Sequence, residues 1–393
     1  MPIQQFSARG FRCLASVEFE ADPGFNLICG PNASGKTSIL EAVAYLGRGK
    51  SFRGAPVSSL IRHGERAFVL FGKVDDGGRA SSVGVRNSAA GLEVRIDGQS
   101  GGGSAELASA LPLQIIDPDV HDLVAGAPDE RRRYLDWIAF HVEHDYLESW
   151  RRFRRALKQR NAALRSGQAA HMIRGWNAEF VDLAARIDSG RQRALEVALD
   201  ALEEAGLDLL GSAIRFEYRP GWKEGSDLAA ALDASLDRDV QQGSTQVGPH
   251  RADLRLIYDE RQARKLVSRG QQKLLACAMI LAATETAQAA LERPLLLLRD
   301  DPAQHGRPLV QRRQRRLQGE HRKQQQARRP RALDVGRDLD GLEAKRGAAF
   351  VFAAGSAFAG DGVLTADTAK RFVASLPSVE SLANSLEAEG KTE

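Results

Sequence analysis

The sequence Gly30-Pro31-Asn32-Ala33-Ser34-Gly35-Lys36-Thr37 matches the phosphate-binding pattern G-x-x-x-x-G-K-(S/T) at every fixed position. Residues 25–29 are mostly apolar and predict a strand before this loop, and residues 38–43 predict a helix after it. In that context, backbone N–H groups of the loop and the positive end of the helix hold phosphate oxygens. We therefore expect residues 30–37 to bind a nucleotide, rather than to form a glycine-rich turn that binds nothing.

Two side chains of the loop have specific predicted roles. Lys36 would reach the terminal phosphates, and the hydroxyl of Thr37 would ligate a magnesium ion. The predicted cofactors are therefore ATP and Mg²⁺.

A second apolar run, residues 294–298, is followed by Arg299, Asp300 and Asp301. A buried strand that delivers an acid beside the phosphate loop can hold magnesium through Asp300, while Asp301 orients the attacking water. The alternative is a surface Asp-Asp turn after a core strand. Arg299 is consistent with this alternative, because a buried strand should have an apolar residue at that position. Gln114, at the junction of strand-like and helical sequence, is a further candidate that would sense the γ-phosphate and the metal.

The segment Ser268-Arg269-Gly270-Gln271 opens onto a long apolar helix that ends near residue 290. Gly270 lets the backbone approach a ligand closely, and the helix N–H groups make a second anion site. We expect Ser268, Gly270 and Gln271 of one protomer to close over the γ-phosphate held by another protomer. A simple helix cap would also explain Ser268.

Composition and length indicate an α/β protein of two domains, or one head with an inserted lobe. No window has 18 consecutive apolar residues, and the amino terminus lacks a secretion signal, so we expect a cytoplasmic protein without a membrane partner. Cys13, Cys29 and Cys277 are far apart in apolar stretches, which is typical of reduced, buried thiols rather than a disulfide framework or a zinc cluster.

Five segments follow from the periodicity. Strand-like alternation, for example at residues 67–71 and 92–96, gives way to helical periodicity and then returns after Gly248. We predict the first part of a nucleotide-binding head (1–124), an inserted helical lobe (125–240), the second part of the head (241–301), an atypical basic segment (302–346) and a final strand and helix (347–393).

The net charge of +4 does not by itself indicate DNA binding. Residues 311–331 carry nine Arg or Lys and one Glu, so the rest of the chain sums to −4. A DNA contact must therefore rest on local clusters, although such a cluster is usually a solvated helix face. One candidate is the helical stretch that carries Arg151, Arg152, Arg154, Arg155, Lys158, Arg160 and Arg165, and a second is the set Arg48, Lys50 and Arg53.

Six blocks, in this order, resemble the RecF family of recombination mediators, DNA repair ATPases whose head is of the ABC type shared with structural maintenance of chromosomes proteins. The blocks are residues 30–37, 46–53 (LGRGKSFR), 129–137 (DERRRYLDW), 157–164 (LKQRNAAL), 248–254 (GPHRADL) and 268–271 (SRGQ). The resemblance implies an α/β P-loop NTPase head of the ABC-ATPase type, with a mixed sheet, flanking helices, a β-rich layer and an inserted α-helical lobe.

The same resemblance implies an ATP-dependent homodimer with weak ATPase activity that maintains replication forks and repairs DNA by recombination. Members of the family would bind single-stranded gaps and junctions of single- and double-stranded DNA, and act with RecO and RecR to load RecA in the SOS response. By this resemblance, the nucleotide roles described above belong to Lys36, Thr37, Gln114, Asp300 and Asp301. The contact with the nucleotide of the other protomer belongs to Ser268, Gly270 and Gln271. A P-loop ATPase of transport or metabolism predicts a membrane partner or a small-molecule pocket, and the sequence indicates neither.

The sequence departs from the family directly after Asp301. An ABC-type head should continue with a Ser-x-Leu-Asp-like segment and an amphipathic helix, whereas residues 302–308 read PAQHGRP. One explanation is a basic tail that grips DNA, and the other, which we favour, is a local frame change that replaced parts of the head. The alternative function is therefore a DNA-binding scaffold that binds nucleotide but does not hydrolyse it.

Overall fold

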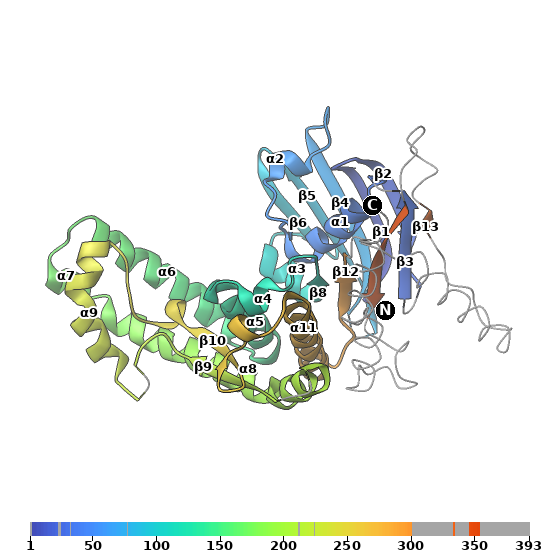
Figure 1. Ribbon diagram of the computed structural model, residues 1–393. Helices are drawn as coiled ribbons and strands as arrows, with labels where there is room; N and C mark the ends of the chain where they lie inside the picture. Colours follow the sequence, from blue (N-terminus) through green and yellow to red (C-terminus); the bar gives the residue numbers. More distant parts are fainter. Residues whose placement is uncertain are drawn as a thin grey trace, which may run out of the picture. The chain divides into compact units, whose positions relative to one another are not determined.

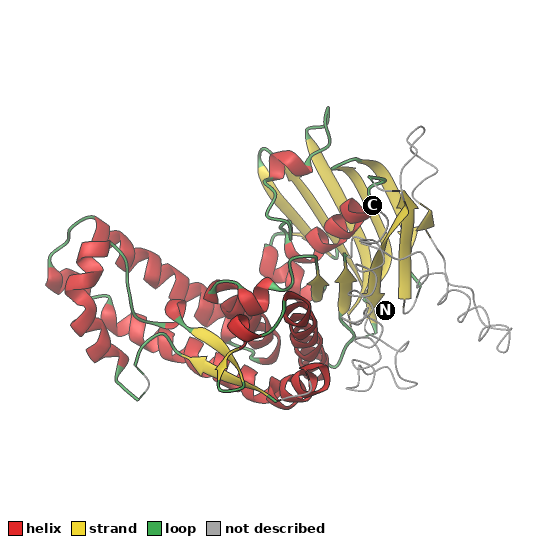
Figure 2. Ribbon diagram, in the orientation of Figure 1, coloured by secondary structure: helices red, strands yellow, loops and turns green. Residues whose placement is uncertain are grey.

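The computed structural model describes residues 2–22, 25–31, 33–76, 78–210, 213–223, 225–300, 333–334 and 346–353. These residues form two compact units. The first contains the described residues up to Pro118 and from Glu292 onward, and the second contains the described residues of Asp119–Leu291. The first unit is rich in strands and the second is mostly helical (Figure 2). The helical unit is thus an insertion in the first, which confirms the predicted α/β class with an inserted helical lobe.

The first unit contains an antiparallel sheet of six strands in the order β2-β1-β4-β5-β6-β7 (Figure 1). Its strands are β1 (Ile3–Phe11), β2 (Leu14–Glu20), β4 (Ala67–Asp76), β5 (Arg79–Ser88), β6 (Gly91–Ile96) and β7 (Gln99–Ser100). Buried and exposed side chains alternate along β5, as expected for a sheet with one face on a core. This sheet is the β-rich layer that the alternating sequence predicts.

A second sheet of five strands, in the order β13-β3-β14-β12-β8, positions the candidate nucleotide site. Its strands are β3 (Phe25–Pro31), β8 (Leu113–Ile116), β12 (Leu296–Arg299), β13 (Leu333–Asp334) and β14 (Arg346–Ala353). β8 and β12 are parallel, whereas β14 lies antiparallel between β12 and β3. Therefore β3, β8 and β12 all run in one direction, and their carboxyl ends meet at the same edge of the sheet.

Helix α1 (Lys36–Arg48) packs in the core of the first unit, with α2 (Val57–Leu60) and α3 (Ser104–Ala110) nearby. Tyr45 meets Phe11 and Phe68 edge to face, with ring centroids 6.1 and 5.1 Å away, and its hydroxyl accepts a hydrogen bond from Asn87 Nδ2 at 2.7 Å. A Cβ at Gly47 would lie 2.5 Å from a methyl carbon of Leu113, so α1 approaches the start of β8 closely. The helix that leaves the phosphate loop is thereby held by both sheets.

The second unit combines helices with a small antiparallel sheet in the order β11-β10-β9. Its helices are α4 (Asp122–Ala125), α5 (Pro128–Val142), α6 (Tyr146–Arg165), α7 (Ala170–Arg174), α8 (Asn177–Leu210), α9 (Leu228–Gln242), α10 (Ala263–Leu266) and α11 (Arg269–Leu291), with a 3₁₀ turn at Pro249–Arg251. Its strands are β9 (Ile214–Arg219), β10 (Asp253–Tyr258) and β11 (Arg261–Gln262).

This unit extends beyond the lobe boundaries of 125–240 expected from the sequence, because residues 241–291 pack with it. Arg131 of α5 forms a buried ion pair with Asp253 at the start of β10, with Nε 2.8 Å from Oδ1. The hydroxyl of Tyr134, also on α5, donates to the carbonyl oxygen of Met279 on α11 at 2.9 Å. These contacts join β10 and α11 to the helical unit, although the periodicity assigns them to the nucleotide-binding head.

Helix α11 is long and apolar enough, by length and composition alone, to cross a membrane. Most of this apolar stretch is buried by α5, α8 and α4 within the same unit. A core helix of a folded domain has this composition and this burial, and α11 is packed as such a helix.

A buried ion pair holds α6 to α9. Arg160 and Asp239 are both fully buried, and Nη1 of Arg160 lies 2.8 Å from Oδ2 of Asp239 and 2.7 Å from the hydroxyl oxygen of Thr245. Nε of Arg160 donates to Oδ1 of Asn177 at 3.3 Å. Arg160 is therefore a structural residue, and it is removed from the basic residues of this helix that the sequence offered as DNA contacts.

Candidate nucleotide site

The phosphate loop connects the end of β3 at Pro31 to the start of α1 at Lys36. Ala33 and Gly35 have φ angles of 64° and 90°, which turn the chain sharply into the helix. A Cβ at Gly35 would lie 3.0 Å from Sγ of Cys13, so only glycine suits this position in both conformation and space. Asn32 lies outside the described residues, and Gly30 and Pro31 are described by their backbone alone.

The amino terminus of α1 has the features of an anion site. The residue before the helix, Gly35, has no side chain that could cap it. The hydroxyl of Ser34 is buried and has no hydrogen-bond partner among the described residues. A buried hydroxyl without a partner at the start of a helix fits a bound phosphate, whose oxygens would accept from the hydroxyl and from helix N–H groups.

Thr37 and Asp300 meet although they are far apart in the sequence. The Thr37 hydroxyl donates to Oδ1 of Asp300 at 3.0 Å, and the Asp300 N–H donates to the carbonyl oxygen of Ile116 at 2.9 Å. Asp300 thus directly follows β12 at the edge where the phosphate loop lies, which favours the metal-ligand interpretation over a surface turn. Asp301 lies outside the described residues.

Gln114 contacts the carboxyl-terminal end of α1. It is buried in β8, two residues before the last residue of that strand, and its Oε1 accepts from Nη2 of Arg48 at 3.4 Å. Arg48 is the last residue of α1, so it lies at the opposite end of the helix from Lys36. Burial lowers the pKa of Arg48 to about 10, and the carboxylate of Asp117 partly offsets that effect.

Asp117, which follows β8, was not considered in the sequence analysis. Leu296 and Arg299 of β12 lie opposite Leu113 and Ile116 of β8, so the next pair along these parallel strands is Asp300 and Asp117. Two acidic residues therefore follow adjacent strands, and of these Asp300 contacts Thr37 whereas Asp117 acts electrostatically on Arg48. The signal in the sequence was an apolar run, residues 113–116, that ends in an acid, the same pattern that identified Asp300.

Magnesium would need ligands beyond protein carboxylates here. Within the described part of the chain, no group of three or more His, Cys, Asp or Glu side chains could hold a metal ion. Mg²⁺ commonly binds nucleotide phosphates with only one or two carboxylates, and Thr37 with Asp300 fits that pattern.

A buried carboxylate on α1 supports the neighbouring loops. Glu41 is fully buried and receives two hydrogen bonds from Arg12, each 2.9 Å long, and one from the hydroxyl of Ser51. Of the second basic set proposed from the sequence, Arg48 is turned inward, whereas Lys50 and Arg53 are exposed.

The predicted signature segment lies in the second unit, at the start of α11. The Ser268 N–H donates to Oε1 of Gln271 at 2.8 Å, and the Gln271 N–H donates to the Ser268 hydroxyl at 3.3 Å. This reciprocal pair is a capping box, so the local role of Ser268 is the helix cap that was the alternative interpretation. Ser268, Arg269 and Gly270 are also exposed, which leaves this turn accessible to a second molecule.

One cysteine differs from the expectation of buried thiols. Cys13 is exposed, and its Sγ lies 3.5 Å from the hydroxyl oxygen of Ser38 in the first turn of α1. Cys277 is buried in α11 as expected, and the side chain of Cys29 lies outside the described residues.

Comparison with known proteins agrees with this geometry. The family described as RecF/RecN/SMC N terminal domain matches residues 2–326. The chain is 41% identical over 304 residues to the DNA replication and repair protein RecF of Edwardsiella ictaluri (strain 93-146), which covers 77% of this chain and 85% of the relative. It is also 41% identical over 303 residues to the protein of the same name from Yersinia pseudotuberculosis serotype O:1b (strain IP 31758), covering 77% and 84%.

The chain belongs to the RecF family. The family resemblance stated from the sequence is thereby confirmed, and with it the coarse function of a DNA replication and repair protein. A solved structure described as the recombination mediator protein RecF-ATPrS in the RecFOR pathway superposes with a TM-score of 0.73 and 23% identity, covering 88% of this chain and 95% of that chain. The agreement in fold confirms the expected RecF head of the ABC-ATPase type.

Proposed function

We propose that this chain is an ATP-dependent DNA-binding protein of recombinational repair and replication-fork maintenance. ATP and Mg²⁺ bind at the phosphate loop, a homodimer forms around the nucleotide, and slow hydrolysis releases it. The observation that carries the nucleotide part is the Thr37–Asp300 hydrogen bond at the edge where the uncapped start of α1 and the buried Ser34 hydroxyl lie. The solved RecF structures described with ATP and an ATP analogue support the same ligand.

Each described residue of the site has a proposed part in phosphate binding. Lys36 pairs with the terminal phosphates, and the loop N–H groups and the Ser34 hydroxyl donate to phosphate oxygens. Mg²⁺ neutralises charge that develops on those oxygens during hydrolysis. Thr37 and Asp300 would hold the ion, and Gln114 remains the proposed residue that senses the γ-phosphate and the metal. Asp301 remains the proposed residue that orients the attacking water.

The metal assignment gives a direct prediction for Asp300. Replacing Asp300 with asparagine removes one negative charge without changing the side-chain shape, so the Mg²⁺ concentration needed for nucleotide binding should rise at least about tenfold. Fluorescent ATP titrated at several Mg²⁺ concentrations measures this. Asp300→Asn should leave weak, metal-independent nucleotide binding unchanged, and an unaltered Mg²⁺ dependence would refute the assignment. Glu20→Gln, an exposed carboxylate on β2, is the matched control.

Dimerisation is proposed through the exposed start of α11. Ser268 and Gly270 of one subunit would close over the γ-phosphate bound by its partner, with Gln271 holding the turn through the capping box. The N–H groups at the start of a 23-residue helix favour an anion at this position.

We also propose a biological role for the chain, based on its membership of the RecF family. The chain would act in the cytoplasm, bind single-stranded gaps and junctions of single- and double-stranded DNA, and cooperate with RecO and RecR in loading RecA during the SOS response. The names of the curated relatives and of the solved structures support this placement in repair.

ATP turnover with and without gapped DNA tests the proposed function. We expect slow hydrolysis that gapped DNA increases, together with a monomer-to-dimer shift on addition of ATP. The specific alternative is a scaffold that binds nucleotide and DNA without hydrolysis, and it is motivated by the departure from the family pattern after Asp301. Tight ATP binding without turnover selects the scaffold, and absence of ATP binding rejects both.

A further inference from the structure

Helix α6 has an unusual distribution of charge. Between Ser149 and Ala178 the sequence contains eight Arg or Lys and no Asp or Glu, in a chain whose net charge is only +4. Three of these basic residues form ion pairs within the second unit. Arg160 pairs with buried Asp239, Arg152 lies 3.8 Å from Glu179, and Arg174 pairs with Asp233. A substantial local excess of positive charge remains.

Four exposed basic residues of α6 are aligned on one face. Arg151, Arg155, Lys158 and Arg165 are separated by four, three and seven residues, the spacings that place side chains on the same side of a helix. The opposite side is buried and contains Phe153, Ala156, Arg160, Ala163 and Leu164. All four basic residues are exposed, and we call them the α6 basic face (Figure 1 shows α6 within its unit).

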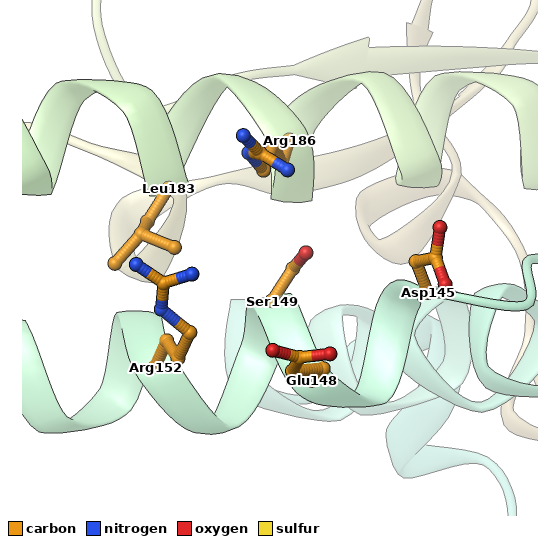
Figure 3. A pocket seen from close by; sticks show the side chains of 6 residues that line it. All are labelled: Asp145, Glu148, Ser149, Arg152, Leu183 and Arg186. Carbon is orange, nitrogen blue, oxygen red and sulfur yellow. The ribbon is translucent and has the colours of Figure 1, made fainter.

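Three of the four residues of the α6 basic face are not neutralised by neighbouring acids. Arg155, Lys158 and Arg165 form no ion pair with an acidic side chain among the described residues. By contrast, a small cavity of about 190 Å³ on the flank of α6 toward α8 contains both signs of charge, Asp145 and Glu148 with Arg152 and Arg186 (Figure 3). That flank is balanced, so the excess charge belongs to the outward face.

The length of the face matches a nucleic-acid backbone. Arg151 and Arg165 are 14 residue steps apart, which is about 21 Å along the helix. Each strand of duplex DNA places one phosphate every ~3.4 Å along its axis, so about six phosphates of one strand lie within that length. A rigid, straight row of cations suits a duplex, which is itself straight over such distances.

Single-stranded DNA fits this face less well. Proteins that bind single strands combine positive charge with exposed aromatic rings on which bases stack. Phe153 is buried and Trp150 is only partly exposed, and the guanidinium of Arg154 lies over the Trp150 ring at 5.2 Å from its centroid. The face therefore offers charge without a stacking platform.

We infer that the α6 basic face binds the phosphate backbone of duplex DNA, independently of base sequence. The inference rests on the proposed function and assigns its double-stranded contact, at a junction or beside a gap, to one helix of the inserted unit. Because backbone contacts release counterions, log K should fall with log salt by a slope of about −0.9 for each phosphate contact.

The experiment uses the full chain with ATP and measures fluorescence anisotropy of a blunt duplex and of a single strand of equal length at several KCl concentrations. In the triple variant Arg155→Gln, Lys158→Gln and Arg165→Gln, duplex affinity should fall at least about tenfold near 0.1 M salt, and the salt slope should shrink by about 2.7. Affinity for the single strand should change less.

Two sets of control variants separate a local contact from overall charge. Arg186→Gln, Arg193→Gln and Arg215→Gln remove the same charge from exposed arginines that pair with Asp182, Glu143 and Glu260, and should keep the wild-type slope. Ala162 lies on the same line, four residues after Lys158, and is exposed. Ala162→Lys should therefore strengthen duplex binding, and Ala162→Glu should weaken it.

The outcomes are distinguishable. If the triple variant keeps the wild-type slope, if the paired-arginine control loses as much affinity, or if the single strand loses more than the duplex, the inference about α6 is overturned while the proposed function stands. If the unaltered chain binds neither duplex nor gapped DNA, the proposed function fails and the inference fails with it. Normal ATP affinity in the triple variant shows that the nucleotide site is intact.

Discussion

Replacing Lys36 with alanine should weaken ATP binding about 100-fold and abolish the ATP-dependent dimer. The ammonium group makes charge-assisted hydrogen bonds to phosphate oxygens, and loss of about 3 kcal/mol of such interactions corresponds to about two orders of magnitude in Kd. Dimerisation should fail with it, because the proposed contact of Ser268 and Gly270 is to a γ-phosphate held by Lys36 of the other subunit. Titration with a fluorescent ATP analogue and light scattering with saturating ATP measure the two effects.

The matched control is Lys73→Ala, which removes an exposed lysine from β4 of the same unit. It should retain both ATP affinity and the dimer. Helix α1 begins at Lys36 and its buried face lies further along, at Leu40, Val43 and Leu46, so Lys36→Ala should fold normally. Unchanged affinity and unchanged dimerisation in Lys36→Ala would contradict the nucleotide site and the closure in trans.

Replacing Arg160 with methionine should destabilise the second unit by about 3–5 kcal/mol. The substitution leaves the carboxylate of Asp239 fully buried without its cation, and an unpaired buried charge is strongly unfavourable. Thr245 also loses the donor to its hydroxyl oxygen. All four tryptophans of the chain, Trp137, Trp150, Trp176 and Trp222, belong to this unit, so urea unfolding followed by tryptophan fluorescence reports on it selectively.

Two further variants test the cause. Arg155→Met changes a neighbouring exposed arginine of the same helix and should alter stability by no more than about 0.5 kcal/mol. The double variant Arg160→Met and Asp239→Leu removes both charges and should recover much of the lost stability. Equal destabilisation by Arg155→Met and Arg160→Met would mean that the buried ion pair is not the source.

The sequence predicted the parts of the site that are local. The phosphate loop, its strand and its helix are contiguous, and an apolar run ending in an acid located Asp300. The amphipathic pattern predicted the helical lobe, because burial of one helix face requires little knowledge of the partner.

The long-range parts could not be read in the same way. The register between β8 and β12 pairs Arg299 with Ile116, so Asp300 and Asp117 both follow this last pair, and a register is a property of two strands. Likewise, the sequence cannot show that Arg160 turns inward while Arg155 and Lys158 turn outward, because all three are long cations on one helix. The outcome depends on Asp239, which is 79 residues away.

The position of β14 has a consequence for shortened forms of the chain. Residues 346–353 lie beyond the part that matches the family, yet they pair with β3 on one side and β12 on the other. A chain that ends at residue 326 would lack β14. The strand before the phosphate loop (β3) and the strand before Asp300 (β12) would then no longer be joined by hydrogen bonds through β14. Two inner sheet edges would be left with unsatisfied amide and carbonyl groups, and such edges recruit foreign strands, so a chain trimmed to the family boundary is prone to self-association.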